Sequence, residues 1–227
     1  MTPAEEVSLG CRVLAAHGNA DLIWGHLSRR DGDGVWLKAA GYGMEEITPG
    51  RVVRIDRSGR LLGGRGRVHL EYPIHTEIMA ARPDVNAVVH SHAEAVVAFA
   101  ATGLPLRPVG HEGVLFWPPD IARFTLTGDL IRDRELGAAV AAALGDRNAL
   151  LLHRHGLVTA GPDVPTAVMT AIFLEKACRM QLAVAAAGAG LDSSGEAEAL
   201  AKRDRCYGPA QMEAAWDYLV RTLPEHG

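Results

Sequence analysis

Two apolar segments of the chain each run directly into a pair of histidines. Residues 86–92 read NAVVHSH and residues 148–155 read NALLLHRH. Apolar runs this short predict buried strands, and side chains two residues apart on a strand project from the same face. Each segment therefore predicts a strand that presents two imidazoles at its polar end. Two such ends in one chain predict that the histidines meet at one edge of a sheet.

These imidazoles are candidate ligands for a divalent metal. Neutral imidazole is the commonest protein ligand for zinc and related ions, and three such ligands leave a coordination position open for substrate. His90 and His92 share one face, but spacing alone leaves open whether His153 or His155 joins them. A single pair of this kind is also typical of solvent-exposed histidines at a strand end.

Glu71 is the candidate carboxylate because it stands at the start of a predicted helix over residues 71–81. An acid at this position stabilises the helix through its dipole. Beside a metal it would also serve as a base for a proton that the ion has made acidic. Spacing does not decide between these two roles.

Strands and helices alternate along the chain, and several links between strands are too short for crossover helices. This favours a mixed or mainly antiparallel sheet covered by helices, and the absence of repeats and linkers favours one domain over residues 1–227. The predicted elements are helices at 3–17, 71–81, 93–101, 133–144 and 164–187, one or two helices within 196–222, strands at the two histidine segments, β-hairpins between 23 and 70, and a hairpin-like stretch over 107–117.

Composition excludes several classes of function. A net charge of -4 and a pI near 6.2 argue against a general nucleic-acid binder or a protein of anionic membranes. No run approaches the roughly 18–20 apolar residues that span a bilayer. The acidic N-terminal segment is unlike a signal peptide, and three scattered cysteines indicate reduced thiols, so we expect a cytoplasmic protein.

Taken together, five segments resemble the class II aldolase/adducin family, whose members include sugar-phosphate aldolases, an epimerase and decarboxylases of dihydroxy-aromatic acids. The block over residues 82–92 is specific, and the ordered set is more so. The segments are GHLSRR at 25–30, EEITP at 45–49, EYPIH at 71–75, RPDVNAVVHSH at 82–92 and LLLHRHGL at 150–157.

The resemblance implies a three-layer α/β/α sandwich with a mainly antiparallel central sheet. It also implies that His90, His92 and His155 hold the metal, so that His155 rather than His153 is the third ligand, with Glu71 as catalytic acid/base. The ion is expected to be Zn²⁺, with Mn²⁺, Co²⁺ or Fe²⁺ as alternatives. The partners implied are a small-molecule substrate and further copies of the chain, in a homotetramer with its active site at a subunit interface.

The chain departs from the sugar-phosphate aldolases where they hold phosphate. Their T-P-[ST]-G turn is LKAAG at residues 37–41, and their Ser-Ser pair is His69-Leu70; Ala and Leu cannot donate hydrogen bonds to phosphate. We therefore expect a pocket for a carboxylate or a phenolic oxygen. Its predicted substrate-binding residues are His26, Ser28, Lys38, Gly41 and His69.

The catalytic tyrosine of those aldolases also has no counterpart, and His111 or Glu112 stands in that region. His111 is a candidate for proton transfer, although both residues are also typical of an exposed turn. The expected activity is that of a metal-dependent carbon–carbon lyase, an aldolase or decarboxylase, acting on a non-phosphorylated hydroxy, oxo or dihydroxy-aromatic acid. The alternatives are a sugar-phosphate aldolase, epimerase or dehydratase, and a non-catalytic, adducin-like interaction module.

Overall fold

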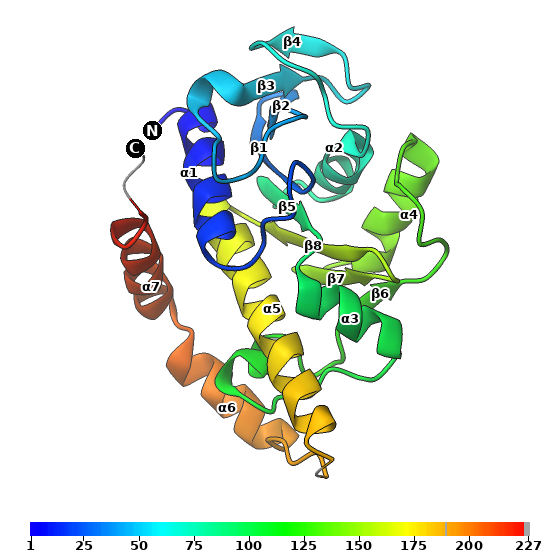
Figure 1. Ribbon diagram of the computed structural model, residues 1–227, viewed down its shortest axis with the longest axis vertical. Helices are drawn as coiled ribbons and strands as arrows, with labels where there is room; N and C mark the ends of the chain where they lie inside the picture. Colours follow the sequence, from blue (N-terminus) through cyan, green and yellow to red (C-terminus); the bar gives the residue numbers. More distant parts are fainter. Residues whose placement is uncertain (189, 225–227) are drawn as a thin grey trace.

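The computed structural model of the protein describes residues 1–188 and 190–224. One eight-stranded sheet forms its centre, in the order β4-β3-β2-β1-β5-β8-β7-β6 (Figure 1). Neighbouring strands are antiparallel except for the parallel pair β6 and β7. The strands are β1 (His26–Asp31), β2 (Gly34–Lys38), β3 (Val52–Ile55), β4 (Leu61–Gly63), β5 (Ala87–Ser91), β6 (Ala122–Phe124), β7 (Ala149–Leu152) and β8 (Gly156–Gly161).

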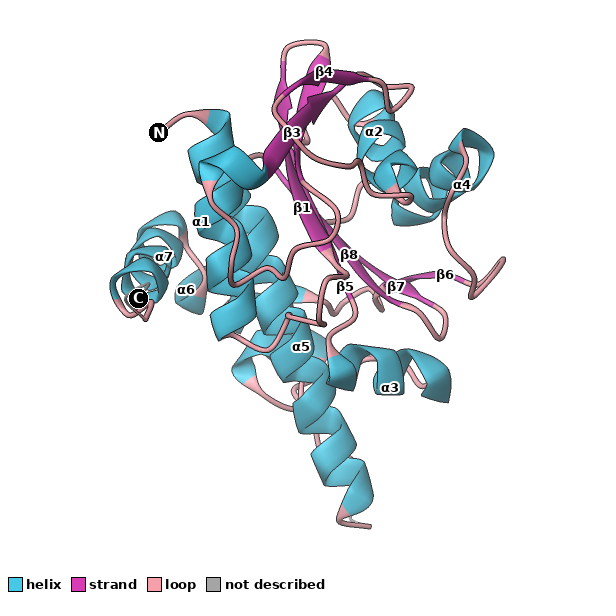
Figure 2. Ribbon diagram, turned by 45° about the horizontal axis from the view of Figure 1, so that its top comes forward, coloured by secondary structure: helices cyan, strands magenta, loops and turns pink. Residues whose placement is uncertain are grey.

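Helices cover both faces of this sheet, which confirms the predicted three-layer sandwich (Figure 2). Ala87 and Val89 of β5 pack into the core on the side of α1, α3 and α5, whereas Val88 between them packs into the core under α2 and α4. The helices are α1 (Pro3–Ala16), α2 (Tyr72–Ala81), α3 (Glu94–Thr102), α4 (Arg134–Leu144), α5 (Val164–Ala186), α6 (Glu196–Cys206) and α7 (Pro209–Arg221), with 3-10 turns η1 (Pro49–Arg51) and η2 (His111–Leu115).

Most predicted elements are present, and their ends follow local signals. Thr2 and Glu5 form a reciprocal capping box at the start of α1, and the side chain of Asp163 caps α5. Although α5 is 23 residues long, no helix among residues 1–188 and 190–224 is long and apolar enough to cross a membrane.

The hairpin expected over residues 107–117 is wrong, because this segment is irregular and contains η2 instead of paired strands. Pro105, Pro108 and Pro118 lack the backbone N–H that a strand ladder needs. The sequence also did not reveal β6, which is only three residues long, or β8.

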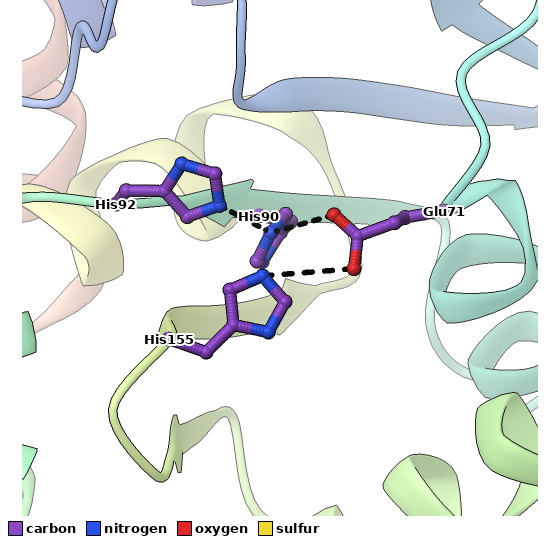
Figure 3. Close-up of side chains that lie close together, drawn as sticks. All are labelled: Glu71, His90, His92 and His155. Carbon is purple, nitrogen blue, oxygen red and sulfur yellow. Dashed lines mark hydrogen bonds and ion pairs between the residues drawn. The ribbon is translucent and has the colours of Figure 1, made fainter. Parts of the chain in front are cut away.

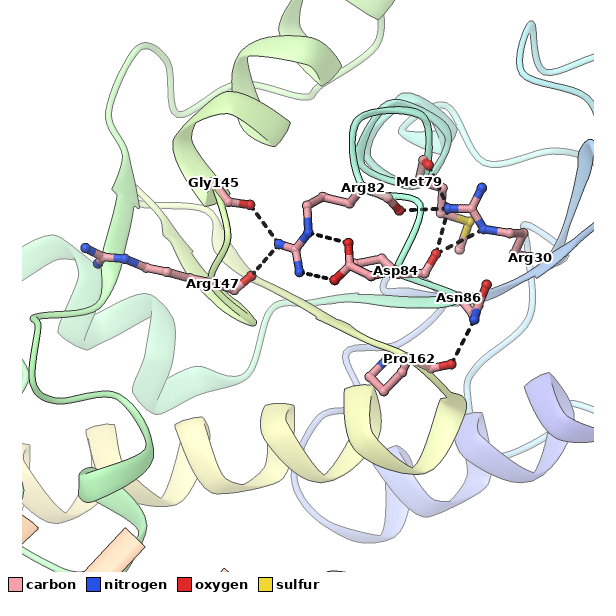
Figure 4. Close-up of polar contacts among 9 residues, drawn as sticks. Arg30, Met79, Arg82, Asp84, Asn86, Gly145, Arg147 and Pro162 are labelled. Atoms are coloured by element: carbon pink, nitrogen blue, oxygen red, sulfur yellow. Dashed lines mark hydrogen bonds and ion pairs between the residues drawn. The ribbon is translucent and has the colours of Figure 1, made fainter. Parts of the chain in front are cut away.

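The turn between α2 and β5 is fixed by two arginines (Figure 4). Arg82 pairs with Asp84 at 2.6 and 2.8 Å and donates to the carbonyl of Gly145 at 2.7 Å. Arg30 donates to the carbonyl of Val85 and to two carbonyls at the end of α2. The arginine and aspartate of the RPD segment are therefore structural: they hold β5, and with it the histidines at its end, in place.

Candidate metal centre

Four predicted residues lie together where β5 ends and β8 begins (Figure 3). Glu71 stands at the N-cap of α2, His90 lies in β5, His92 follows β5, and His155 immediately precedes β8. Each offers one ligand atom, and these four atoms all lie within 4.8 Å of one another. The antiparallel pairing of β5 with β8 accounts for this meeting, since it sets the end of one strand beside the start of the other.

Hydrogen bonds determine which nitrogen each imidazole offers. His90 Nδ1 lies 2.9 Å from the carbonyl of Leu157, which can only accept, so Nδ1 carries the proton. His92 Nδ1 likewise donates to Asp21 at 2.9 Å. The Nε2 atoms of His90 and His92 then face each other at 3.0 Å. Two lone pairs this close need a shared cation between them.

Glu71 completes the cluster as a charged carboxylate. Its oxygens lie 3.5 Å from His90 Nε2 and 3.6 Å from His155 Nε2, and one of them accepts the backbone N–H of Ile131 at 2.8 Å. Burial acts to raise the pKa of Glu71, but its interactions with His155 and His90 outweigh burial and lower that pKa. Burial, followed by the neighbouring His90, lowers the pKa of His92 to about 4.

The donor set fits a divalent ion. Ligand distances of about 2.0–2.2 Å place donor atoms about 3–4 Å apart, and the distances from Glu71 to His90 and from Glu71 to His155 fall in that range. Two of the imidazoles are oriented through the opposite nitrogen, as metal-binding histidines ordinarily are. The Nδ1 atom of His155 is buried and has no partner among the described residues. The four side chains can therefore hold a divalent metal.

The structure separates the two histidines that spacing left undecided. His155 belongs to the cluster, whereas His153 lines a different small cavity with Arg123 and Thr125. His111 begins η2 and is exposed, and it is not part of the cluster within one chain. Its predicted role in proton transfer stays a prediction.

His26 and Ser28 belong to a buried network behind the metal centre. His26 pairs with His90 across β1 and β5, and its Nδ1 lies 2.6 Å from Nε2 of His75. The other nitrogen of His75 lies 2.6 Å from the Ser28 hydroxyl. Burial lowers the pKa of both His26 and His75, which keeps these rings neutral. Ser28 is fully buried, and its hydroxyl orients His75. Its predicted contact with substrate stays a prediction.

The side chains of Lys38 and His69 are also in contact. Both residues stand where the sugar-phosphate aldolases have their phosphate subsite. Lys38 Nζ lies 3.4 Å from His69 Nε2 and donates to the carbonyl of Ile23 at 3.1 Å. Burial, and then Lys38, lower the pKa of His69 to about 3, so the ring is a neutral acceptor. Lys38 has no exposed surface and supports His69. Gly41 lies in an exposed turn with a φ of 92°, beside Arg67.

The metal cluster opens through His92 and His155 into a cleft of about 960 Å³. Sequence reasoning missed most of this cleft, including Asp21, Trp24 and Arg154, because its walls come from loops that have no periodic pattern. The lining residues are Gly18, Ala20, Asp21, Trp24, His92, Glu94, Val97, Ala98, Leu130, Arg154 and His155.

The family called Class II Aldolase and Adducin N-terminal domain matches residues 5–182, most of the chain. The protein belongs to this family. The resemblance inferred from the five motifs is thereby confirmed.

Similar proteins include two 3,4-dihydroxyphthalate decarboxylases. The one from Arthrobacter keyseri is 34% identical over 240 residues, covering 96% of this chain and 93% of the relative. The one from Terrabacter sp. is 34% identical over 238 residues, covering 96% and 95%. Among solved structures, an L-fuculose 1-phosphate aldolase from Glaciozyma antarctica is 27% identical with a TM-score of 0.85, covering 97% of this chain and 88% of that one. The named relatives are thus lyases.

Proposed function

We propose that the protein is a divalent-metal-dependent carbon–carbon lyase that decarboxylates a dihydroxy-aromatic acid. The observation that carries the proposal is the cluster of three imidazoles and one carboxylate, which opens into a cleft lined in part by the apolar side chains of Trp24, Val97 and Leu130. The similarity to 3,4-dihydroxyphthalate decarboxylases over almost the whole chain supports this class of substrate. A non-catalytic, adducin-like module would have no use for such a cluster.

His90, His92 and His155 would hold the ion through Nε2, and the bound ion would supply Lewis-acid stabilisation of negative charge on substrate oxygens. Leu157 and Asp21 keep two of these rings in the tautomer that leaves Nε2 free. Trp24 and Leu130 at the cleft provide apolar surface for an aromatic ring and displace water from it.

Glu71 is proposed as the proton carrier. Its carboxylate is charged, so it can accept the proton of a substrate hydroxyl. The bond between ring and carboxyl group then breaks, carbon dioxide leaves, and the electron pair stays on the ring carbon. Glu71 returns its proton to that carbon, and the substrate oxygen takes a proton from water. The backbone N–H of Ile131 holds the carboxylate in position through this exchange.

A sugar-phosphate aldolase is the second candidate, supported by the likeness to the fuculose-phosphate enzyme. The subsite residues favour the decarboxylase. Ala39 and Ala40 offer no side-chain donor to a phosphate. Leu70, which with His69 replaces the Ser-Ser pair of the aldolases, is exposed and apolar and offers none either.

Zinc is proposed as the ion, since three imidazoles and a carboxylate suit it, and manganese, cobalt and iron are alternatives. A cytoplasmic location is proposed because all three cysteines are free thiols. A homotetramer is proposed from the family resemblance, and His111 on the surface would then serve a neighbouring subunit's site. Light scattering during gel filtration measures the number of subunits.

The test is a screen for carbon dioxide and aldehyde release by the metal-loaded enzyme. We expect carbon dioxide from 3,4-dihydroxyphthalate or a related dihydroxy-aromatic acid, and loss of that activity after chelation. Aldehyde release from fuculose 1-phosphate, without turnover of any aromatic acid, would replace the proposal with the aldolase alternative.

A further inference from the structure

The turn that carries His155 into the metal cluster contains an arginine in an unusual backbone conformation. Among the described residues, only Leu22 and Arg154 adopt a positive φ without being glycine, at 46° and 57°. Arg154 occupies the third position of the turn between β7 and β8, which the N–H of His155 closes by bonding to the carbonyl of Leu152 at 3.2 Å. Glycine or asparagine ordinarily fills this position.

Folding gives no reason for an arginine at this point. The side chain is exposed, and no hydrogen bond or ion pair joins its guanidinium to another residue in the described part of the chain. Arg82 differs in this respect, because it pairs with Asp84 and reaches two backbone carbonyls. A left-handed residue that is costly to the backbone and unused by the fold points to a role in binding.

The position of Arg154 indicates what it would bind. It lines the same cleft as His92 and His155, together with the half-exposed ring of Trp24. The other charged residues on the cleft wall are the acids Asp21 and Glu94. Arg154 is thus the one cation among the residues that line the cleft, and an anionic substrate group entering there would pair with it. A guanidinium fits a carboxylate with two parallel hydrogen bonds.

We propose that Arg154 is a specificity-determining residue that binds a second carboxylate of the substrate, one that the reaction retains. This inference rests on the proposed decarboxylase function. The departing carboxylate gives up its charge as carbon dioxide forms, so pairing it with Arg154 would stabilise the ground state and slow the reaction. A retained carboxylate keeps its charge throughout, and binding it positions the ring without that penalty. The substrate class is therefore a dihydroxy-aromatic dicarboxylic acid.

Phthalate and catechol test the subsite without turnover, because phthalate carries the two carboxylates and catechol carries only the two hydroxyls. In Arg154→Gly, which suits the backbone of the turn, calorimetry should show phthalate binding weakened by about 10- to 100-fold. Catechol binding should stay within twofold, and the thermal midpoint should be unchanged or higher. Arg154→Lys keeps the positive charge but loses the geometry for two parallel hydrogen bonds. Its affinity for phthalate should lie between those of the wild type and Arg154→Gly. The charge-matched control Arg205→Gln, on α6, should bind phthalate normally.

With 3,4-dihydroxyphthalate, Arg154→Gly should raise KM by the same factor and change kcat by less than threefold. Normal phthalate binding by this variant, or equal loss of phthalate and catechol binding, would overturn the subsite. If the wild-type enzyme releases no carbon dioxide and yet binds phthalate through Arg154, the proposed reaction fails while the subsite stands. If the wild type and Arg154→Gly release carbon dioxide with the same KM and the same kcat, the reaction stands and the subsite is refuted.

Discussion

The hydrogen bond between Asp21 and His92 gives the sharpest prediction about how the metal centre is built. Asp21 accepts from Nδ1 of His92 at 2.9 Å, which fixes the tautomer that leaves Nε2 free for an ion. In Asp21→Asn the acceptor oxygen stays, but its negative charge is lost. Removing such an outer partner weakens metal binding by about 10- to 100-fold.

The expected size of the effect lies at the lower end of that range. The Asp21 side chain is 35% exposed, so water screens part of its charge. We expect about tenfold weaker Zn²⁺ binding, equivalent to about 1.4 kcal/mol. Competition against a chromophoric chelator at pH 7.5 measures this affinity. The control is Asp33→Asn, which removes a carboxylate that is 95% exposed and pairs with Arg54 away from the cluster.

Unchanged affinity in Asp21→Asn would refute the claim that this bond orients His92 for a metal. An equal loss in both variants would assign the effect to overall charge instead.

Three further predictions concern the centre and its surroundings. Glu71→Gln should lower kcat by at least about 100-fold while the fold is kept, because an amide cannot carry the proton but can still accept the N–H of Ile131; near-normal turnover would contradict this. The metal-free protein should lose stability as pH falls from 6.5 toward 3. In the unfolded chain histidines take up a proton near pH 6.5. In the folded protein burial lowers the pKa of His69 to about 3 and that of His92 to about 4, so protons bind the unfolded chain first and favour unfolding. Urea midpoints would measure that loss, and a constant midpoint between pH 7 and 4.5 would argue against it. Gly156→Ala would place a methyl group in steric conflict with the carbonyl oxygen of Ser91, so it should force β5 and β8 apart. We expect the free energy of urea unfolding to fall by about 1–3 kcal/mol and metal binding to weaken; a variant with wild-type stability would contradict this.

Much of the metal centre could be predicted from the sequence, because side chains alternate regularly along a strand and this pattern can be recognised within a few residues. Apolar runs that end at His90 and near His155 predict imidazoles at strand ends, and β5 and β7 are where these runs predicted them. Periodicity could not choose between His153 and His155, because both follow the last residue of β7 and the turn decides their directions. The family resemblance made that choice.

Residues outside regular elements could not be predicted in the same way. Asp21 lies 71 positions before His92 in the chain, within a loop, and no spacing rule connects them. All six residues of β8 are buried, so the strand shows no alternation of apolar and polar residues. Lys38 and His69 were predicted as direct substrate contacts, yet the interior position of Lys38 depends on how β2 packs against the rest of the fold.

The most direct test of the metal centre compares two histidines of one turn. Metal content per chain is measured by inductively coupled plasma mass spectrometry after loading with Zn²⁺ and desalting, for the wild type, His155→Ala and His153→Ala. The four-residue cluster predicts one tightly held ion in the wild type and in His153→Ala, and loss of most of it in His155→Ala. Full metal content in His155→Ala, or none in the wild type, would contradict the centre proposed for Glu71, His90, His92 and His155.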